Sequence, residues 1–586
     1  MFDLKIVGGT VVDGTGADRF RADVGVKDGK IVEVRRVPPG GDGLAGDAAV
    51  TLDATERIVA PGFVDIHTHY DGQVSWDSLL EPSSCHGVTT VVTGNCGVGF
   101  APVRPGSEEW LIKLMEGVED IPGSALTEGI SWGWESYPEY LDVIGSQHFA
   151  VDVGSQIAHG SVRAYAMGER GARNEPATPE DIAAMAHLVR ESIEAGALGF
   201  STSRTIAHRA MDGEPVPGTF AAEDELFGLG RAMAAGGRAV FELAPQGAAG
   251  EDIVAPKREL EWMRRLGAEI ERPLSFALIQ VDADPNLWRE QLEISADAHA
   301  DGAMLYPQIA ARPFGMLLGF PGHHAFTHRP TYRALKSELP REELAERLAD
   351  PAVKAAILGE SDLPVDTTRQ FDGMFALVQH SLHRIYALGD PPDYEPTPDR
   401  TVASSAADRG EDPLATLYDL MLEDGAGSML MLPFFNYADG NHDAIHEMLT
   451  HPAGVLGLSD GGAHCNLICD ASYPTYLVTH WARDRHRGRK LSLEYVLRKQ
   501  CRDTATLFGL TDRGTIEVGK RADLNVIDFD ALTLHPARMA YDLPAGGNRL
   551  VQGASGYDAT VVNGTVTRRF GRDTGARPGR LVRGAR

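Results

Sequence analysis

Gly62-Phe63-Val64-Asp65-Ile66-His67-Thr68-His69, directly after Pro61, carries the strongest structural signal in this 586-residue chain. Residues two apart on an extended strand point the same way, so His67 and His69 leave one end of a short buried strand together. Two imidazoles that converge on one point supply two ligands of a metal ion. Isolated histidines of this spacing are often ordinary core or surface residues, but the proline and glycine that lead into a buried strand favour the ligand pair.

From this stretch onward, short apolar segments alternate with amphipathic ones such as 179–195, 222–235, 256–266 and 287–300. Eight such alternations predict an α/β fold, the parallel (β/α)₈ TIM barrel, rather than an open sheet or two separate domains. Active sites of barrels lie at the C-terminal ends of the strands, where His67 and His69 stand. The predicted strands are 63–65, 89–93, 151–156, 198–201, 239–243, 274–279, 303–306 and 454–458.

The two ends of the chain share a different pattern. Apolar residues alternate with polar ones in 3–7, 10–12, 23–27 and 30–34, and Gly8-Gly9, Asp13-Gly14 and Asp28-Gly29 separate them as hairpin turns. The same style returns in 514–524 and 559–564. We expect residues 1–60 and 511–586 to form one small β-sandwich beside a barrel of residues 61–510. The arginine-rich end, 572–586, is interpreted as a frayed terminus rather than as a partner-binding tail.

Residues 312–451 are too many for one connection of a barrel. They contain helical segments at 342–348 and 413–423 and a strand-like run at 429–435. We expect this insertion to lie over the barrel mouth, where loops shape a substrate pocket.

Two further strand ends carry metal-ligand residue types. Cys96 follows the second strand within Thr93-Gly94-Asn95-Cys96-Gly97, and a thiolate flanked by glycines would be exposed and able to bind Zn²⁺. An inert buried cysteine is the equally open alternative. Asp460 follows the eighth strand within Ser459-Asp460-Gly461-Gly462 and could bind a metal and accept a proton from its water. An ordinary turn aspartate is the alternative there.

Composition excludes several function classes. The formal net charge of −28 argues against nucleic acid or an anionic membrane as a partner. No signal peptide and no transmembrane helix are expected from the sequence. The five cysteines form no disulfide framework, which favours the cytoplasm.

The sequence resembles the amidohydrolase superfamily, and within it the D-aminoacylase branch, the N-acyl-D-amino-acid deacylases. The resemblance covers nearly the whole chain. It implies a barrel with a β-sandwich, zinc, and release of a carboxylic acid from an N-acyl-D-amino acid. It also implies metal ligation by His67, His69 and Cys96, and a base or ligand role for Asp460. The segments that carry it are 62–69, 87–97, 158–163, 199–202, 459–461 and 519–524.

The chain departs from that branch at three strand ends. The branch usually supplies a histidine from strand five and another from strand six, but no histidine occurs between His208 and His299 here. Glu242 on strand five could replace the first as an oxygen ligand, whereas Phe276 on strand six cannot ligate. The strand-four lysine that many relatives carboxylate is also absent. A two-metal centre of the usual kind is therefore not expected.

These residues predict a zinc-dependent amidohydrolase with one or two Zn²⁺ ions. The predicted ligands are His67, His69, Cys96, Glu242 and Asp460, and Asp460 is also the predicted base. Arg163, Arg204 or His208 could bind a substrate carboxylate, because a guanidinium matches that group, although each could equally be a surface or salt-bridged residue. His159 and His464 are further candidates for the pocket.

The predicted substrate is a small-molecule amide, first of all an N-acyl amino acid. A cyclic amide, a dipeptide or a xenobiotic anilide is the alternative within enzymes. A catalytically inactive barrel used as a scaffold is the alternative of another class, because two usual ligands are missing. Assembly into a homo-oligomer is compatible with the sequence.

Overall fold

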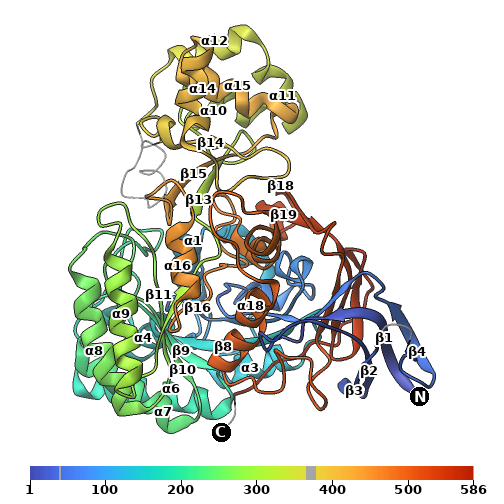
Figure 1. The fold of residues 1–586 in the computed structure, drawn as a ribbon. Helices are drawn as coiled ribbons and strands as arrows, with labels where there is room; N and C mark the ends of the chain where they lie inside the picture. Colours follow the sequence, from blue (N-terminus) through green and yellow to red (C-terminus); the bar gives the residue numbers. More distant parts are fainter. Residues whose placement is uncertain (39–40, 365–377, 585–586) are drawn as a thin grey trace.

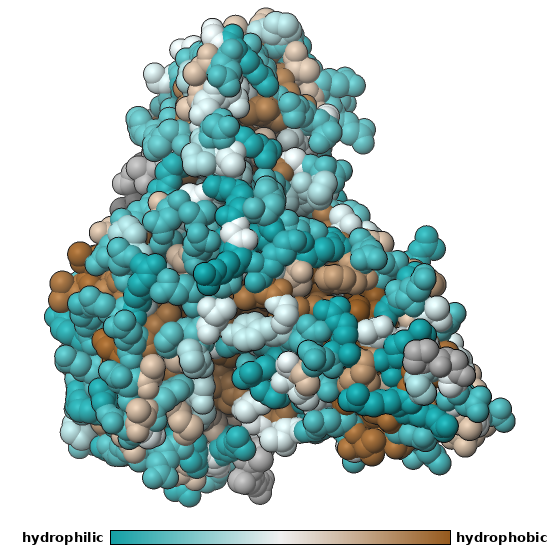
Figure 2. Space-filling view, viewed as in Figure 1, coloured by the Kyte–Doolittle hydropathy of each residue, from teal (hydrophilic) through white to brown (hydrophobic). Residues whose placement is uncertain are grey.

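The computed structural model describes residues 1–38, 41–364 and 378–584. Figure 1 shows three parts: a barrel with its helices, a helical lobe above it, and a large sheet at the right that holds both blue and red strands. The face drawn in Figure 2 is mostly hydrophilic, and apolar residues show mainly at the left edge of the barrel and in the recesses between the parts.

The barrel is an eight-stranded parallel sheet in the order β16-β12-β11-β10-β9-β8-β7-β6. Every predicted barrel strand is present, and the predicted TIM-barrel class is confirmed. The strands are short and buried because helices cover their outer face. Their bounds are β6 (Phe63–Asp65), β7 (Val88–Thr93), β8 (Asp152–Ala158), β9 (Gly199–Ser203), β10 (Val240–Ala244), β11 (Leu274–Ala277), β12 (Leu305–Ile309) and β16 (Val455–Leu456).

The first and last strands meet just beyond their C-terminal ends. The backbone N–H of Asp460 donates to the His67 carbonyl over 3.1 Å, and that of His69 donates to the Gly461 carbonyl over 2.8 Å. Ser459 Oγ donates within the same seam, lying 2.6 Å from Oδ2 of Asp65. The barrel therefore closes at the segments that carry three of the predicted ligands.

Helix α6 (Pro179–Ala195) shows how the outer layer is built. Thr178 accepts from the backbone N–H of Asp181 and the Asp181 side chain accepts in return, a capping box, and Gly196 ends the helix at φ +114°. Met185, Val189 and Ile193 form its buried stripe. The other helices of this layer and of the barrel loops are α1 (Glu108–Glu119), α2 (Gly123–Gly129), α3 (Tyr137–Gly145), α4 (His159–Met167), α5 (Glu169–Ala172), α7 (Glu223–Gly236), α8 (Ala255–Ile270), α9 (Leu287–Ala300), α16 (Asp443–Thr450), α17 (Tyr473–Tyr476), α18 (Leu493–Leu497) and α19 (Thr504–Leu507).

Strands from both chain ends form one nine-stranded sheet. At its centre, β5 (Ile58–Pro61) runs parallel to β1 and antiparallel to β17 (Leu524–Ile527). The remaining strands are β1 (Phe2–Val11), β2 (Phe20–Lys27), β3 (Lys30–Arg36), β4 (Ala48–Asp53), β20 (Tyr557–Val562), β21 (Thr565–Arg569) and β22 (Arg572–Asp573), and β18 (Thr533–Ala540) pairs separately with β19 (Arg549–Ser555).

One predicted turn in this sheet is wrong. Gly8-Gly9 does not separate two strands, because β1 continues through it with a register shift against β2 between Ile6 and Gly9. Gly8 has φ +76°, so the pair forms a bulge that a glycine accommodates without strain. The Asp28-Gly29 turn between β2 and β3 is present as expected.

The arginine-rich end is not frayed over the residues that the structure describes. The backbone N–H of Val153 donates to the Arg580 carbonyl over 3.0 Å, and that of Val582 donates to the Val153 carbonyl over 2.7 Å. The tail therefore pairs along β8 at the lower rim of the barrel, where Figure 1 places the C-terminus. The interpretation as a loose terminus missed these backbone partners; residues 585–586 lie outside the described part.

The insertion forms the helical lobe at the top of Figure 1. A three-stranded sheet in the order β13-β15-β14 joins it to the barrel, and the lobe has its own core, which includes Phe320, Phe326 and Tyr418. Its elements α11, α15 and β15 correspond to the predicted segments 342–348, 413–423 and 429–435. Residues 365–377 lie outside the described part. The elements are β13 (Phe314–Leu318), α10 (Pro330–Glu338), α11 (Arg341–Leu348), α12 (Pro351–Gly359), β14 (Tyr386–Ala387), α14 (Val402–Arg409), α15 (Pro413–Ala426) and β15 (Leu430–Phe435).

Within the described residues, none of the helices combines the length and the apolar character needed to cross a bilayer.

Candidate metal centre

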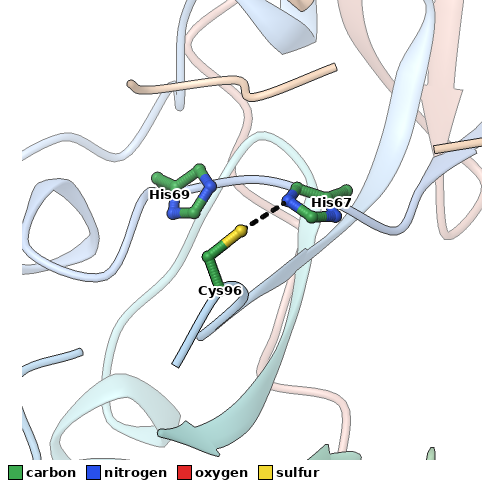
Figure 3. A group of neighbouring side chains, drawn as sticks. All are labelled: His67, His69 and Cys96. Atoms are coloured by element: carbon green, nitrogen blue, oxygen red, sulfur yellow. Dashed lines mark hydrogen bonds between the residues drawn. The ribbon is translucent and has the colours of Figure 1, made fainter. Parts of the chain in front are cut away.

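His67, His69 and Cys96 converge at the C-terminal ends of β6 and β7, as Figure 3 shows. Sγ of Cys96 lies 3.3 Å from Nε2 of His67. The potential ligand atoms of the three residues all lie within 4.8 Å of one another. All three side chains are buried, so the group is held in place by its surroundings.

Asp460 brings a carboxylate to the same point. Its Oδ1 lies 3.4 Å from Nε2 of His67 and 3.8 Å from Nε2 of His69. Cys96 also approaches the Nε2 side of His67, so the four residues face a common centre. Two imidazole nitrogens, a thiolate and a carboxylate are all zinc ligands.

Two of these residues have left-handed backbone: Cys96 has φ +55° and Asp460 has φ +50°. For residues other than glycine this conformation costs about 1–3 kcal/mol and is found preferentially at functional sites. Cys96 is 8% exposed, so the expected exposed thiolate is wrong. The flanking glycines serve close packing instead, because a Cβ on Gly94 would lie 2.0 Å from the Gln156 carbonyl oxygen and one on Gly97 2.6 Å from the Ser203 nitrogen.

Gln308, which the sequence analysis missed, fixes the ring of His67. Its Oε1 lies 2.8 Å from Nδ1 of His67. An amide oxygen only accepts, so Nδ1 carries the proton and Nε2 keeps its lone pair for the centre. The sequence feature that could have indicated this role is a glutamine inside the buried strand β12.

Glu242 contacts two of the predicted ligands from β10. Its Oε2 accepts the backbone N–H of Cys96 over 3.0 Å, and its Oε1 lies 3.9 Å from Nδ1 of His67. The closest ring nitrogen of His67 to the carboxylate is thus Nδ1. Glu242 is fully buried, and its Oε1 has no hydrogen-bond donor.

Burial controls the protonation of the whole group. It raises the pKa of Cys96 and of Asp460 well above their usual values and that of Glu242 to about 8. The same burial lowers the pKa of His67 to about 4 and that of His69 well below its usual value. Buried acceptors of this kind need a cation to offset their desolvation. The donor set therefore fits a divalent metal ion.

A second group also brings ligand atoms together: the buried Glu395 and His442 and the partly exposed His480. Arg485 already donates to both carboxylate oxygens of Glu395, over 3.1 and 3.0 Å. The negative charge of this group is thus compensated from within the chain, in contrast to the group around His67.

The centre lines a cavity of about 330 Å³. Its polar lining also includes Glu119, Thr205 and the predicted pocket residues His208 and His464. Apolar side chains form the rest, and the lobe strands β13 and β15 supply four large ones, Phe314, Met316, Phe434 and Phe435. The insertion therefore contributes a wall of the cavity.

Three other predicted pocket residues do not line this cavity. Arg163 Nη1 lies 2.6 Å from Oε2 of Glu225, and Nε2 of His159 lies 2.8 Å from Oε1 of the same carboxylate. Arg204 Nε donates to Glu259 over 2.7 Å. These side chains are held by carboxylates from the helical layer, which the strand-end positions alone did not reveal.

The amidohydrolase family matches residues 50–568, which span the barrel and the strands β5, β17 and β20 of the terminal sheet. The chain belongs to the amidohydrolase family. This confirms the class of protein that the motifs at 62–69, 87–97 and 459–461 indicated.

Individual relatives point the same way. D-aminoacylase of Alcaligenes xylosoxydans xylosoxydans is 32% identical over 315 residues, 53% of this chain and 58% of the relative, so the match spans little more than half of that protein. An uncharacterised protein of Mycobacterium tuberculosis is 27% identical over 90% of this chain and 84% of its own length. The structure of N-acyl-D-glutamate deacylase from Bordetella bronchiseptica, complexed with zinc and a phosphonate inhibitor, superimposes with a TM-score of 0.63 at 24% identity, over 99% of each chain, and supports the fold.

Proposed function

We propose that this protein hydrolyses an amide C–N bond and that it does so with zinc. The observation that carries the proposal is the convergence of His67 Nε2, Cys96 Sγ and Asp460 Oδ1 in the lining of a cavity, with the ligand atoms of His69 beside them. A bound zinc ion would supply a water of lowered pKa and polarise the scissile carbonyl. One ion accounts for this donor set, and the strand-five and strand-six histidines that the branch usually supplies are absent.

Asp460 is proposed to move the proton of the attacking water. Oδ1 of Asp460 faces the imidazoles, whereas its Oδ2 lies 3.8 Å from Nε2 of His464. Asp460 would accept the proton of the attacking water at one oxygen. It would then return that proton to the leaving nitrogen. His464 lines the cavity beside it and is neutral, because burial lowers its pKa to about 3.

The first substrate class is the N-acyl amino acid. It is supported by the name of the D-aminoacylase relative and by the motifs shared with that branch. Glu242 is proposed to support the ion, through Cys96 and His67 or by direct ligation. The partner of the protein is then a small-molecule amide, and the predicted cytoplasmic location and homo-oligomer remain predictions.

A neutral amide, such as an N-acyl amine or an anilide, is the second candidate. The wall formed by Phe314, Met316, Phe434 and Phe435 favours an apolar group. Among the lining residues that the structure describes there is no lysine or arginine, and Arg163 and Arg204 are paired elsewhere. A substrate carboxylate would therefore meet only neutral histidines, since burial lowers the pKa of His208 to about 4.

Matched substrates distinguish the two candidates. N-acetyl-D-leucine, N-acetyl-L-leucine and N-acetyl-isopentylamine share the acyl group and the branched chain, but only the first two carry a carboxylate. Release of free amine from each would be measured with zinc-loaded and with chelated protein. Faster zinc-dependent release from the D-amino acid supports the first candidate, and faster release from the neutral amide supports the second. Zinc-independent release, or none from these and from a panel of cyclic amides, dipeptides and anilides, would contradict the proposal.

A further inference from the structure

Glu119 is a buried carboxylate at the metal centre that no strand-end motif indicates. It is the last residue of α1, and Asp120 ends that helix with φ +52°. Only 2% of Glu119 is exposed, although Glu109 on the same helix has a largely exposed side chain. A carboxylate in such surroundings costs free energy unless a donor or a cation compensates it.

The end of α1 is fixed to the segment that follows Asp460. The backbone N–H of His464 donates to the carbonyl of Glu119, and that of Asn466 donates to Oδ2 of Asp120 over 2.8 Å. These hydrogen bonds fix the backbone at Glu119, so the side chain starts from a defined position. Its position relative to the centre is set by the fold.

The two carboxylate oxygens of Glu119 have different surroundings. Oε1 lies 3.4 Å from Nδ1 of His69, and both atoms are buried without a hydrogen-bond partner of their own. Oε2 lies 3.8 Å from Nε2 of His464. The shortest contact of the carboxylate with a ligand residue is thus with the ring nitrogen of His69 that is turned away from Asp460.

The two histidines are held in parallel ways. Nδ1 of His67 faces the amide oxygen of Gln308, while Nδ1 of His69 faces a carboxylate oxygen of Glu119. In both rings Nε2 is the nitrogen that faces Asp460. A metal-bound histidine normally donates its other N–H to an acceptor, and a carboxylate there also increases the basicity of the ligand nitrogen.

We propose that Glu119 is a positioning residue that accepts the Nδ1–H of His69 and directs Nε2 of that ring to the metal ion. These two atoms, Oε1 of Glu119 and Nδ1 of His69, lie 3.4 Å apart. Glu119 itself binds neither the ion nor the substrate. The inference rests on the proposed function, because it assumes that His69 is a ligand.

The test measures metal affinity rather than turnover. Chelated protein would be titrated with Co²⁺, whose thiolate charge-transfer absorption reports binding next to Cys96, and with Zn²⁺ in competition. Glu119→Gln keeps an acceptor but removes the charge, and Glu119→Ala removes both. We expect the affinity to fall about 10-fold in the first variant and further, up to about 100-fold, in the second. Glu109→Gln on the same helix is the control and should bind as the unaltered protein does.

Three results would overturn the proposal. One is an unchanged affinity in Glu119→Gln. A second contrary result would be that the unaltered protein binds two ions, whereas Glu119→Gln binds one and keeps the thiolate absorption at full affinity. Glu119 would then be a ligand of a second ion. If both variants fail to fold, Glu119→Asp would be used, because it keeps the negative charge but has a side chain shorter by one methylene group. An unchanged metal affinity of Glu119→Asp would be the third contrary result. If the unaltered protein binds no ion at all, it is the proposed function that fails.

Discussion

The backbone N–H of Asp460 donates to the carbonyl oxygen of His67 over 3.1 Å. These residues follow the last and the first strand of the barrel. Together with the hydrogen bond from the His69 N–H to the Gly461 carbonyl, this bond closes the barrel and joins two parts of the candidate metal centre. Asp460 Oδ1 lies 3.4 Å from Nε2 of His67 within the same pair. The centre can therefore assemble only when the barrel is closed.

Replacing His67 or His69 by alanine should remove the bound metal and the hydrolytic activity. The thermal midpoint should stay near that of the unaltered chelated protein, because a catalytic metal seldom holds a large core together. Elemental analysis, amide hydrolysis and thermal unfolding of the same preparation check this. Full activity of His67→Ala would contradict the mechanism.

The metal-free protein should lose stability as the pH rises from about 6.5 to about 8. Burial raises the pKa of Glu242 from 4.5 to about 8, so the folded chain keeps a proton that the unfolded chain has already released. The free energy of unfolding then falls with rising pH in this window. The lowered pKa of His67 has the opposite effect, but only below its ordinary value of 6.5.

Thermal unfolding of chelated protein across this window, compared with Glu242→Gln, checks the prediction. The thermal midpoint of Glu242→Gln should fall less steeply with pH. Added zinc should raise the thermal midpoint of the unaltered protein most near pH 8. Equal slopes in the two proteins would show that Glu242 is ionised in the folded metal-free chain.

Glu242→Gln should also weaken zinc binding by about 10-fold or more, the size found even for residues that only contact the ligands. Its Oε2 accepts the Cys96 N–H, and an amide can present its NH₂ group there instead and turn the thiolate away. Competition with a chromophoric chelator measures this affinity. Zinc affinity equal to that of the unaltered protein would leave Glu242 a structural role alone.

Truncation at Leu510 should give insoluble protein. It removes β17, which pairs with β5 through Val526 and Val59, and so uncovers a buried apolar face of the terminal sheet. Solubility after expression and size-exclusion chromatography test this. A soluble, active truncated chain would show that the two chain ends fold independently.

Local sequence pattern was sufficient for most of the fold and for the four residues that meet at the candidate metal centre. The strands and helices of the barrel follow from periodicity and capping, and α6 and α9 have the predicted bounds. The pattern indicated His67, His69, Cys96 and Asp460 because each follows the end of a strand within four residues, and a barrel brings all such ends to one face.

What could not be predicted depends on contacts distant in sequence. Glu119 reaches the centre from the end of a helix, and Gln308 looks like any buried strand residue until His67 lies opposite it. Arg163 and Arg204 carry the charge that a substrate carboxylate would need, but Glu225 and Glu259 compensate them. Whether a charged side chain is exposed or forms an ion pair depends on tertiary packing and cannot be read from the neighbouring residues in the sequence.

The most direct test of the account is to remove the metal and return it while hydrolysis is measured. Protein freed of metal by a chelator would be titrated with zinc, and metal content and amine release from the better of the matched substrates would be followed together. We expect no activity without metal and a rise in proportion to zinc up to one ion per chain. Activity that persists in protein shown by elemental analysis to contain no metal would contradict the central claim.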